Sequence, residues 1–265
     1  MHDAASPARR APYRLARGHN GRVTHLYRDE AVVLRTQKLG EADRIVTLLT
    51  RETGRVRAVG KGVRRTKSKL GSRLEPFMQV DVQLAHGRSL DIVTQVETIA
   101  PLGHAISNDY RRYTAGTAML ETAERLVAEE REPAVQQYLL LVGGLRALAA
   151  ADLDPTLVLD SFLLRSLAIA GYAPTFEVCA RCGVAGPHRS FSAGAGGMLC
   201  GACRLPGSAS PSADTVVLLA ALLAGDWVAA NAVDARFRRP ASGIVAAYLQ
   251  WHLERSLRSL VHVER

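Results

Sequence analysis

The chain has 265 residues, of which 48% are hydrophobic and 5% aromatic, and it carries a formal net charge of +9 at pH 7. That length allows one or two domains with a sizeable core. The longest apolar run, the nine residues 216–224, is too short to cross a bilayer, and no apolar run follows the first Arg residues. We therefore expect a cytoplasmic protein without a membrane anchor or a secretory signal.

The charge is distributed unevenly along the chain. Residues 1–27 carry a formal charge of +4 and residues 28–105 carry +5, whereas residues 106–178 carry −4. A smaller positive segment, +3 over residues 179–205, surrounds the four cysteines. This asymmetry favours a specific face for a polyanion in the N-terminal half over a charge that serves only solubility.

Residues 1–27 contain five Arg, one acid and two Pro, without a periodic apolar pattern. This composition predicts a disordered basic tail. An Arg-rich, acid-poor start has a faint likeness to an organellar transit peptide, but it is not clearly amphipathic. We favour an extension that adds weak electrostatic affinity for a polyanion.

Five short runs rich in β-branched residues follow, and several alternate apolar with polar residues as half-buried strands do. They occupy residues 31–36, 44–50, 55–60, 78–85 and 90–98. Gly40, Gly54 and a turn at residues 86–88 separate them, and a longer basic insert lies between the third and the fourth. We predict a closed barrel of the OB type over residues 28–105, with an open five-stranded sheet as the alternative.

The basic insert is the strongest electrostatic feature of the sequence. From Arg51 to Arg73 there are nine Lys or Arg and one acid, interleaved with Gly and Ser and without an apolar face. Such charges repel one another until a polyanion neutralises them, and nucleic-acid phosphate is the usual partner. A merely solubilising surface is the alternative. We assign phosphate contacts to this insert and to two cations of the preceding hairpin: Lys61, Arg64, Arg65, Lys67, Lys69 and Arg73, with Lys38 and Arg44.

Phe77 is the only aromatic residue between positions 28 and 105. Barrels that grip single strands by base stacking need several exposed rings. We therefore expect contacts to the nucleic-acid backbone that leave the base edges free for pairing. Such binding has no sequence preference and depends strongly on salt.

After Pro101 the apolar pattern becomes helical, and we predict an α-helical domain over residues 106–265. The expected helices cover residues 110–130, a stretch that starts at Pro133, a stretch from Asp154-Pro155 to Gly171, a stretch that follows Ser212, and residues 240–260. In the second of these, Gly143-Gly144 predicts a kink or an early end.

The four cysteines form the sharpest local motif. Cys179 and Cys182 are followed, after seventeen residues, by Cys200 and Cys203. Two C-x2-C pairs with this separation supply four thiolates that can close a tetrahedron around Zn²⁺, with no open position for catalysis. A redox dithiol pair and disulfides are the alternatives, and a cytosolic setting disfavours disulfides. We predict a structural zinc-binding insertion over residues 176–205 with almost no hydrophobic core of its own.

No catalytic constellation is recognisable in the sequence. Residues 54–61 resemble a phosphate-binding loop, but the spacing is one residue too long, and Gly62 stands where Ser or Thr would bind Mg²⁺. Glu41 and Asp43 lie two residues apart, yet the adjacent Arg44 favours a surface ion pair over a nuclease metal site. The eight His are scattered and form no metal-ligand spacing.

Several longer motifs occur together between residues 28 and 262. They are AVVLRTQKLGEADRIVTLLT (31–50), GKGVRRTKSKLGSRLEPF (60–77), DYRRYTAGTAMLETAERL (109–126), LRSLAIAGYAP (164–174), CARCG (179–183), GDW (225–227) and HLERSLRSL (252–260). In this combination the chain resembles the bacterial RecO family of recombination-mediator and DNA-annealing proteins. Residues 1–27 fall outside the family pattern.

The resemblance implies an N-terminal OB domain, an α-helical C-terminal domain and a zinc-binding insertion that carries the four cysteines. It also implies binding to single- and double-stranded DNA, annealing of complementary strands, joint action with RecR, and help in loading RecA onto strands coated by single-strand-binding protein. Such a protein is non-catalytic and nucleoid-associated, and acts in DNA repair. The alternative is a zinc-bearing nucleic-acid-modifying enzyme, or its specificity subunit, with catalytic carboxylates that the sequence does not reveal.

The resemblance further implies a receptor for the acidic C-terminal tail of single-strand-binding protein. An acidic tail with an apolar end needs a hydrophobic cleft rimmed by Arg or Lys. Two clusters combine these features, although both could equally be surface charges over ordinary core aromatics. They are Arg111 and Arg112 beside Tyr110 and Tyr113, and Arg255 and Arg258 beside Trp251.

Overall fold

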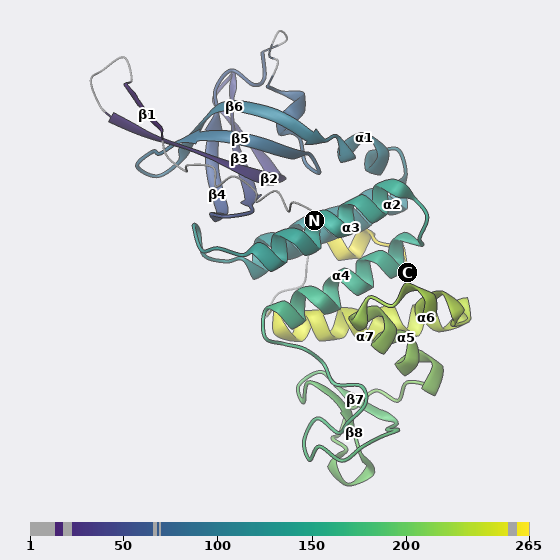
Figure 1. Cartoon of the computed structure of the whole chain (residues 1–265). Coiled ribbons are helices and arrows are strands. Elements are labelled where there is room, and N and C mark those ends of the chain that lie inside the picture. Colours follow the sequence, from purple (N-terminus) through teal and green to yellow (C-terminus); the bar gives the residue numbers. More distant parts are fainter. Residues whose placement is uncertain (1–13, 18–22, 66–67, 69, 254–258, 265) are drawn as a thin grey trace, which may run out of the picture.

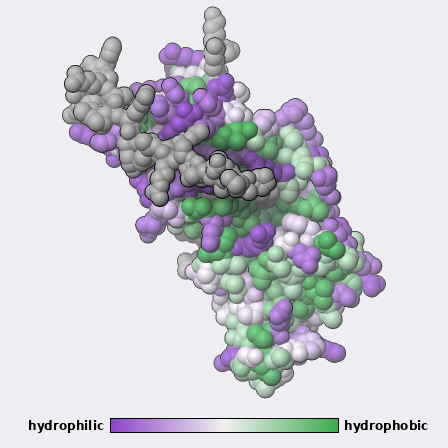
Figure 2. Space-filling view, in the orientation of Figure 1, coloured by the Kyte–Doolittle hydropathy of each residue, from purple (hydrophilic) through white to green (hydrophobic). Residues whose placement is uncertain are grey.

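The computed structural model describes residues 14–17, 23–65, 68, 70–253 and 259–264. Figure 1 shows three parts in a row: a β-barrel at one end, a layer of helices in the middle, and a small hairpin module at the other end. In the space-filling view, hydrophilic residues gather over the barrel, and hydrophobic residues are more frequent over the helices (Figure 2). None of the described helices is long and apolar enough to cross a membrane.

Six strands form the barrel domain: β1 (Arg14–Arg17), β2 (Val23–Leu39), β3 (Asp43–Thr50), β4 (Gly54–Gly60), β5 (Gln79–Ala85) and β6 (Asp91–Ala100). Their order is β1-β2-β3-β4-β6-β5, and β5 also pairs with β2, which closes the sheet on itself. The pairing of β4 with β6 is parallel and the others are antiparallel. This is the predicted closed barrel of the OB type, and the alternative of an open sheet is wrong.

The long strand β2 makes closure possible. Residues 26–32 pair with β5, and residues 31–39 pair with β3. The register shifts between Val33 and Arg35, and such a bulge bends a strand so that it can serve two sides of one barrel. Alternate side chains of β4 are buried and belong to the apolar interior that this closure creates.

The structure differs from the tail expected over residues 1–27. Strand β1 and the first residues of β2 lie inside that range, while residues 1–13 and 18–22 lie outside the described residues. Tyr27 is buried, because its strand pairs with β5 and its ring stacks on His86 with 4.7 Å between centroids. Val23, Thr24 and Tyr27 have a high strand preference, and pairing of this segment with β1 and β5 makes it part of the barrel.

The described part of the helical domain contains α1 (Leu102–Ser107), α2 (Tyr110–Leu126), α3 (Val135–Ala150), α4 (Pro155–Ile169), α5 (Ala213–Ala224), α6 (Trp227–Ala232) and α7 (Arg238–His252). Asp154 caps α4 by accepting a hydrogen bond from Thr156 N–H, and Ser212 caps α5 by accepting one from Thr215 N–H. Both starts were predicted from these residues, because a side-chain oxygen at this position satisfies a free backbone donor.

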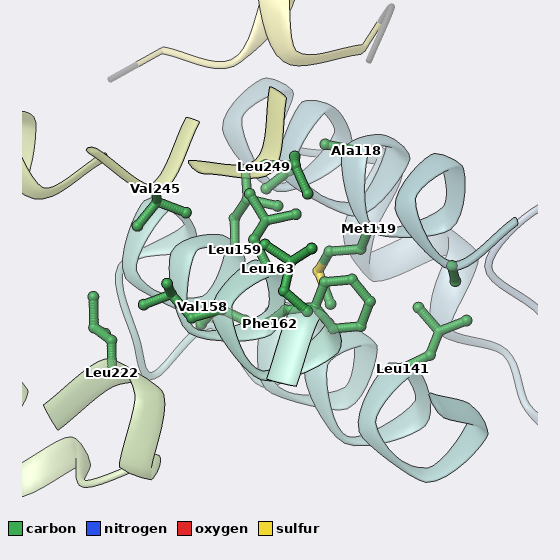
Figure 3. Packing of buried hydrophobic residues seen from close by; sticks show 14 of the residues in the cluster. Ala118, Met119, Leu141, Val158, Leu159, Phe162, Leu163, Leu222, Val245 and Leu249 are labelled. Carbon is green, nitrogen blue, oxygen red and sulfur yellow. The ribbon is translucent and has the colours of Figure 1, made fainter. Parts of the chain in front are cut away.

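Helix α4 lies at the centre of the helical core. Figure 3 shows Phe162 and Leu163 of α4 among Met119 of α2, Leu141 of α3 and Leu249 of α7. The same apolar cluster also includes residues of the barrel domain: Val32, Leu34, Leu49 and Phe77. The barrel and the helices are therefore joined by one continuous hydrophobic contact.

Two of the predicted helix ends differ from the structure, and residues 254–258 of the last predicted helix lie outside the described residues. Helix α2 stops at Leu126, before the expected residue 130, because the chain turns back to the barrel, where Arg131 N–H donates to Arg55 O at 2.9 Å. Helix α7 stops at His252, and a separate 3-10 turn covers residues 259–262.

The early end expected at Gly143-Gly144 does not occur, because α3 continues to Ala150. A Cβ atom at Gly144 would come within 2.3 Å of the Met119 Cε, so this glycine allows α2 and α3 to pack closely. Helix α3 begins at Val135, two residues after the Pro133 that was expected to open it.

Candidate metal centre and nucleic-acid interface

The four cysteine Sγ atoms come together in the small module at the end of the molecule opposite the barrel (Figure 1). They all lie within 4.8 Å of one another, and Cys182 Sγ is 3.7 Å from Cys200 Sγ. Zn–S bonds of about 2.3 Å in a tetrahedron place the sulfur atoms about 3.8 Å apart, whereas a disulfide needs about 2.05 Å. All four cysteines are free, so their arrangement fits a bound metal ion and not a disulfide pair.

The backbone around the cysteines favours a thiolate. Strands β7 (Ser190–Ser192) and β8 (Gly197–Leu199) form a hairpin between the two pairs. Gly183, with φ +73°, turns the first pair, and its N–H donates to Cys179 O at 2.9 Å. The N–H groups of Cys200 and Cys182 donate to the Cys179 sulfur and lower the pKa of this thiol to about 5. The thiolate is the form that binds a metal.

The module has more hydrophobic core than its sequence suggests. Phe176 and Phe191 stack with 6.2 Å between ring centroids, and Phe191 meets Tyr248 of α7 edge-on at 5.8 Å. Met198 is fully buried in the same cluster. The expectation of almost no core is wrong, because Tyr248, which completes the core of the module, belongs to a helix much later in the chain. A metal ion here would hold loops that already rest on an apolar contact.

The predicted DNA-binding cations gather where three strands of the barrel end or begin. Lys38 of β2 lies opposite Arg44 of β3, and Arg44 lies opposite Gly60 of β4, after which Lys61 opens the basic insert. Lys38, Lys61 and Arg65 are exposed, and the side chain of none of them makes a hydrogen bond or an ion pair with a described residue. These three cations are free to bind phosphate.

Three other predicted cations are engaged by the protein itself. Arg44 forms an ion pair with Glu75. Arg64 donates to two carbonyl oxygens of the β2–β3 turn at 2.9 and 3.1 Å, and Arg73 donates to the carbonyl of Val96 at 2.8 Å. These side chains position the insert on the barrel. The charges of Arg64 and Arg73 face carbonyl groups and not carboxylates, so they still add to the positive potential.

The start of the insert is held by an acid. Asp43 Oδ1 accepts a hydrogen bond from Gly62 N–H at 2.7 Å. The expected surface pair of Arg44 with Glu41 or Asp43 is wrong, because Asp43 is used by the insert and Arg44 reaches Glu75 instead. Two further predicted contacts lie outside the described residues: Lys67 and Lys69.

Both arginines of the first predicted partner cluster make contacts within the chain. Arg111 Nη2 donates to the Asp154 carboxylate at 3.1 Å, and Arg112 Nη1 donates to a backbone carbonyl of α1 at 3.2 Å. Tyr110 and Tyr113 are exposed beside them. In the second cluster Trp251 is exposed, and the cations lie outside the described residues: Arg255 and Arg258.

A cleft of about 1400 Å³ lies between the barrel and α2, next to the first cluster. Phe77 and Tyr113 line it and meet edge-on with 5.9 Å between ring centroids. Each acid in its lining is paired with an arginine: Glu75 with Arg44, Glu121 with Arg125, and Glu124 with Arg35. The cleft therefore combines apolar rings with a rim in which no described carboxylate is left unpaired.

The contacts that fix the two domains together have no signal in the sequence. Asp91, buried at the start of β6, accepts hydrogen bonds from Tyr27 OH at 2.5 Å, Gly87 N–H at 3.0 Å and Arg131 Nη2 at 2.6 Å. Arg131 belongs to the α2–α3 loop and lies 40 residues from Asp91 in the chain. A single acid and a single base so far apart belong to no motif.

Comparison with known families agrees with this architecture. Residues 24–102 match the family model for the N terminal of recombination protein O, and residues 107–260 match the model for its C terminal. The first match covers the barrel from the start of β2, and the second covers α2 to α7 with the cysteine module.

Several curated relatives match nearly the whole chain. A protein of Nocardioides sp. is 67% identical over 243 residues, which are 91% of this chain and 100% of the relative. A protein of Streptomyces griseus is 65% identical over 246 residues, and one of Thermobifida fusca is 64% identical over 240. In both cases the match covers 91% of this chain and 99% of the relative. All three relatives are called DNA repair protein RecO.

Proposed function

We propose that this chain, which belongs to the RecO family of DNA repair proteins, is a non-catalytic recombination mediator. In this proposal the barrel holds single- and double-stranded DNA by the backbone, and complementary strands anneal because their bases remain free. The chain then acts with RecR, and helps to load RecA onto strands coated by single-strand-binding protein. The proposed location is the nucleoid.

The observation that carries this proposal is the group of free cations at one end of the barrel. Lys38, Lys61 and Arg65 are exposed around the ends of three adjacent strands, so they offer several phosphates a contact at once. The rings of Tyr27 and Phe77 are buried. Described aromatic rings of the barrel therefore do not compete for the bases, which supports a grip on the backbone.

We propose that the four cysteines hold one structural Zn²⁺ per chain. Four sulfur ligands complete a tetrahedron, so the ion has no open position for a water or a substrate. In this role the ion keeps the loops of the module packed against Tyr248 of α7. The module lies at the end of the molecule opposite the barrel (Figure 1), and the free cations belong to the barrel, which supports a structural role and not a role in DNA binding.

We also propose that the acidic tail of single-strand-binding protein docks beside the Arg111–Arg112 cluster or beside the cluster of Arg255 and Arg258. For the first cluster, the adjacent cleft supplies the exposed ring of Tyr113, behind which the ring of Phe77 is buried. An apolar tail end can enter this cleft while its carboxylates meet arginine side chains. DNA and tail would then occupy different parts of the molecule.

Strand annealing tests the central proposal. Two complementary oligonucleotides that carry a donor and an acceptor fluorophore are mixed with the purified chain, without nucleotide and without added metal. We expect pairing to accelerate, and we expect Lys38→Ala/Lys61→Ala/Arg65→Ala to remove most of the acceleration. Mg²⁺-dependent chemical change of the oligonucleotides would support the alternative of a nucleic-acid-modifying enzyme instead.

A further inference from the structure

We propose that a second pocket, formed by the α2–α3 loop with the start of α3 and the end of α4, docks a basic, apolar segment of a partner protein. The pocket has a volume of about 680 Å³. It uses none of the side chains assigned above to DNA, to the metal or to the acidic tail. The proposal therefore adds a second partner site to the function already proposed.

The walls of this pocket are apolar. Leu126 comes from the end of α2, Pro133 from the loop, Val135 from the start of α3 and Ile169 from the end of α4. Val135 and Ile169 are 36% and 37% exposed, and Leu139, one turn further along α3, is 51% exposed. Neighbouring aliphatic side chains that remain this exposed are typical of a surface that another chain covers.

The mouth of the pocket is acidic. Glu129 and Glu132 line it and are exposed, and neither pairs with a cation among the described residues. Among the residues that the structure describes, the lining contains no Lys or Arg. The cleft beside α2 differs in this respect, because each of its acids already has an arginine partner. The second pocket therefore presents two uncompensated carboxylates, which attract a cation and repel phosphate.

The lining also contains an acceptor without a partner. Gln137 is 5% exposed, and its Nε2 donates to Ser166 O at 2.8 Å. Because a carbonyl oxygen can only accept, this bond fixes the orientation of the amide and leaves Oε1 as the remaining polar atom. Oε1 is buried and accepts no hydrogen bond from the described residues. A buried acceptor of this kind is unfavourable until a donor reaches it.

Together these features select one class of occupant. Apolar side chains of the partner fit the walls, a flanking Lys or Arg meets Glu129 and Glu132, and an N–H donor satisfies Gln137. Nucleic acid and an acidic tail both carry negative charge, which Glu129 and Glu132 would repel. We therefore assign the pocket to a short peptide segment in which apolar residues stand beside Lys or Arg.

A peptide selection on the full-length chain tests this assignment. Phage that display random dodecapeptides are selected on the immobilised wild-type chain and counter-selected on Glu129→Lys/Glu132→Lys. Both glutamates are exposed, so this variant should keep the wild-type circular dichroism spectrum and melting temperature. Selected peptides are synthesised with a fluorescent label, and their affinities are measured by anisotropy.

The matched control is Asp152→Lys/Asp214→Lys, which makes the same change of charge at two exposed acids outside the pocket. We expect enriched peptides that combine apolar and basic residues. Their affinity should fall at least tenfold in Glu129→Lys/Glu132→Lys and in Val135→Asp, and remain near wild type in the control.

Three outcomes would overturn the proposal. One is a selection that yields no peptide with a higher affinity for the wild type than for Glu129→Lys/Glu132→Lys. Another is enrichment of acidic peptides. The third is self-association of the wild-type chain that Glu129→Lys/Glu132→Lys abolishes in sedimentation experiments, because the occupant would then be a second copy of this chain. Gln137→Leu adds a further test. It removes the buried acceptor, so the selected peptides should bind this variant more weakly than the wild type.

Discussion

Arg131 Nη2 lies 2.6 Å from Oδ1 of Asp91, whose side chain is fully buried in the barrel. This ion pair joins the α2–α3 loop to the start of β6. The backbone of the same residue donates to Arg55 O at 2.9 Å, so the loop also lies along the edge of β4. Polar contacts therefore fix the relative position of barrel and helices where their shared apolar core ends. They also fix the loop that carries Glu129 and Glu132 at the proposed peptide pocket.

The first prediction concerns this pair. Arg131→Met should lower the free energy of unfolding by about 2 kcal/mol, because the buried carboxylate of Asp91 loses its charged donor and keeps only neutral ones. Urea unfolding followed by circular dichroism measures the change. Arg57→Met is the control, since Arg57 lies 3.8 Å from Glu130 in an exposed pair, whose loss should cost about 0.5 kcal/mol. Equal losses in the two variants would contradict the role given to Asp91.

The second prediction concerns the free cations. Lys38→Ala/Lys61→Ala/Arg65→Ala should weaken binding to all DNA sequences alike, and the slope of log K against log salt should fall by about 2–3 units if each cation neutralises one phosphate. Titrations of labelled oligonucleotides at several salt concentrations measure the slope. The control removes three exposed cations of the cysteine module, Arg181, Arg189 and Arg204. The idea fails if both triple variants change the slope equally.

The remaining cations of the insert extend this prediction. Arg64→Ala/Arg65→Ala/Lys67→Ala/Lys69→Ala should reduce the slope by about 3–4 units if all four bind phosphate. Arg64 also bonds to the β2–β3 turn, so its loss should loosen the insert as well. The side chain of Arg65 makes no hydrogen bond or ion pair with a described residue, so comparison with Arg65→Ala separates the two effects.

The third prediction concerns the metal. Freshly purified protein should contain about one Zn²⁺ per chain, and Cys182→Ser should lower the melting temperature more than it lowers DNA affinity. The ion should stabilise the fold of the module, and this module lies at the end of the molecule opposite the barrel that carries the free cations. Elemental analysis and thermal unfolding measure the two quantities. Substoichiometric zinc together with four titratable thiols would contradict the proposed site.

The fourth prediction concerns the acidic tail. Arg111→Ala/Arg112→Ala and Arg255→Ala/Arg258→Ala are tested separately against a peptide with the tail's chemistry, and one of the pairs should lose at least tenfold in affinity while naked DNA still anneals. Calorimetry measures the binding. Because Arg111 also holds Asp154, the cap of α4, a fall in melting temperature is expected for the first pair. Unchanged affinity in both variants would place the receptor elsewhere.

The fifth prediction concerns pH. His252 packs against Tyr172 and Tyr248, with 4.5 Å between ring centroids in each pair, and burial lowers its pKa. The folded state therefore favours the neutral ring. Its contribution to stability is fully present above the unfolded-state pKa and is lost as the pH falls through the lower folded-state pKa. Unfolding in urea between about pH 7.5 and about pH 5 should show this loss, since the ordinary pKa of His lies inside that interval.

The matched variant for this experiment is His252→Phe. It keeps an aromatic ring against both tyrosines but cannot take up a proton. Part of the decline with falling pH should therefore disappear. A decline as steep as that of the wild type would show that His252 does not contribute.

Features that depend on short stretches of chain were predictable from the sequence. The alternation of β4, the caps at Asp154 and Ser212, and the two C-x2-C pairs follow from side-chain periodicity, local hydrogen bonding and the ligand geometry of a single ion. The excess of positive charge in the barrel half is equally a property of composition. These features establish an OB-type barrel, a helical domain and a cysteine cluster before any contact is known.

Features that depend on residues far apart in the chain were decided by packing. Asp91 meets Arg131, and Tyr248 completes the core of the cysteine module, although neither relationship leaves a pattern in the sequence. The predicted DNA-binding cations show the same limit, because they look alike in the sequence until the fold pairs Arg44 with Glu75 and leaves the side chain of Arg65 without a described partner. Composition sets how much charge a segment carries. Which charges remain available to a partner depends on the carboxylates and carbonyl groups that the folded chain brings within hydrogen-bonding distance.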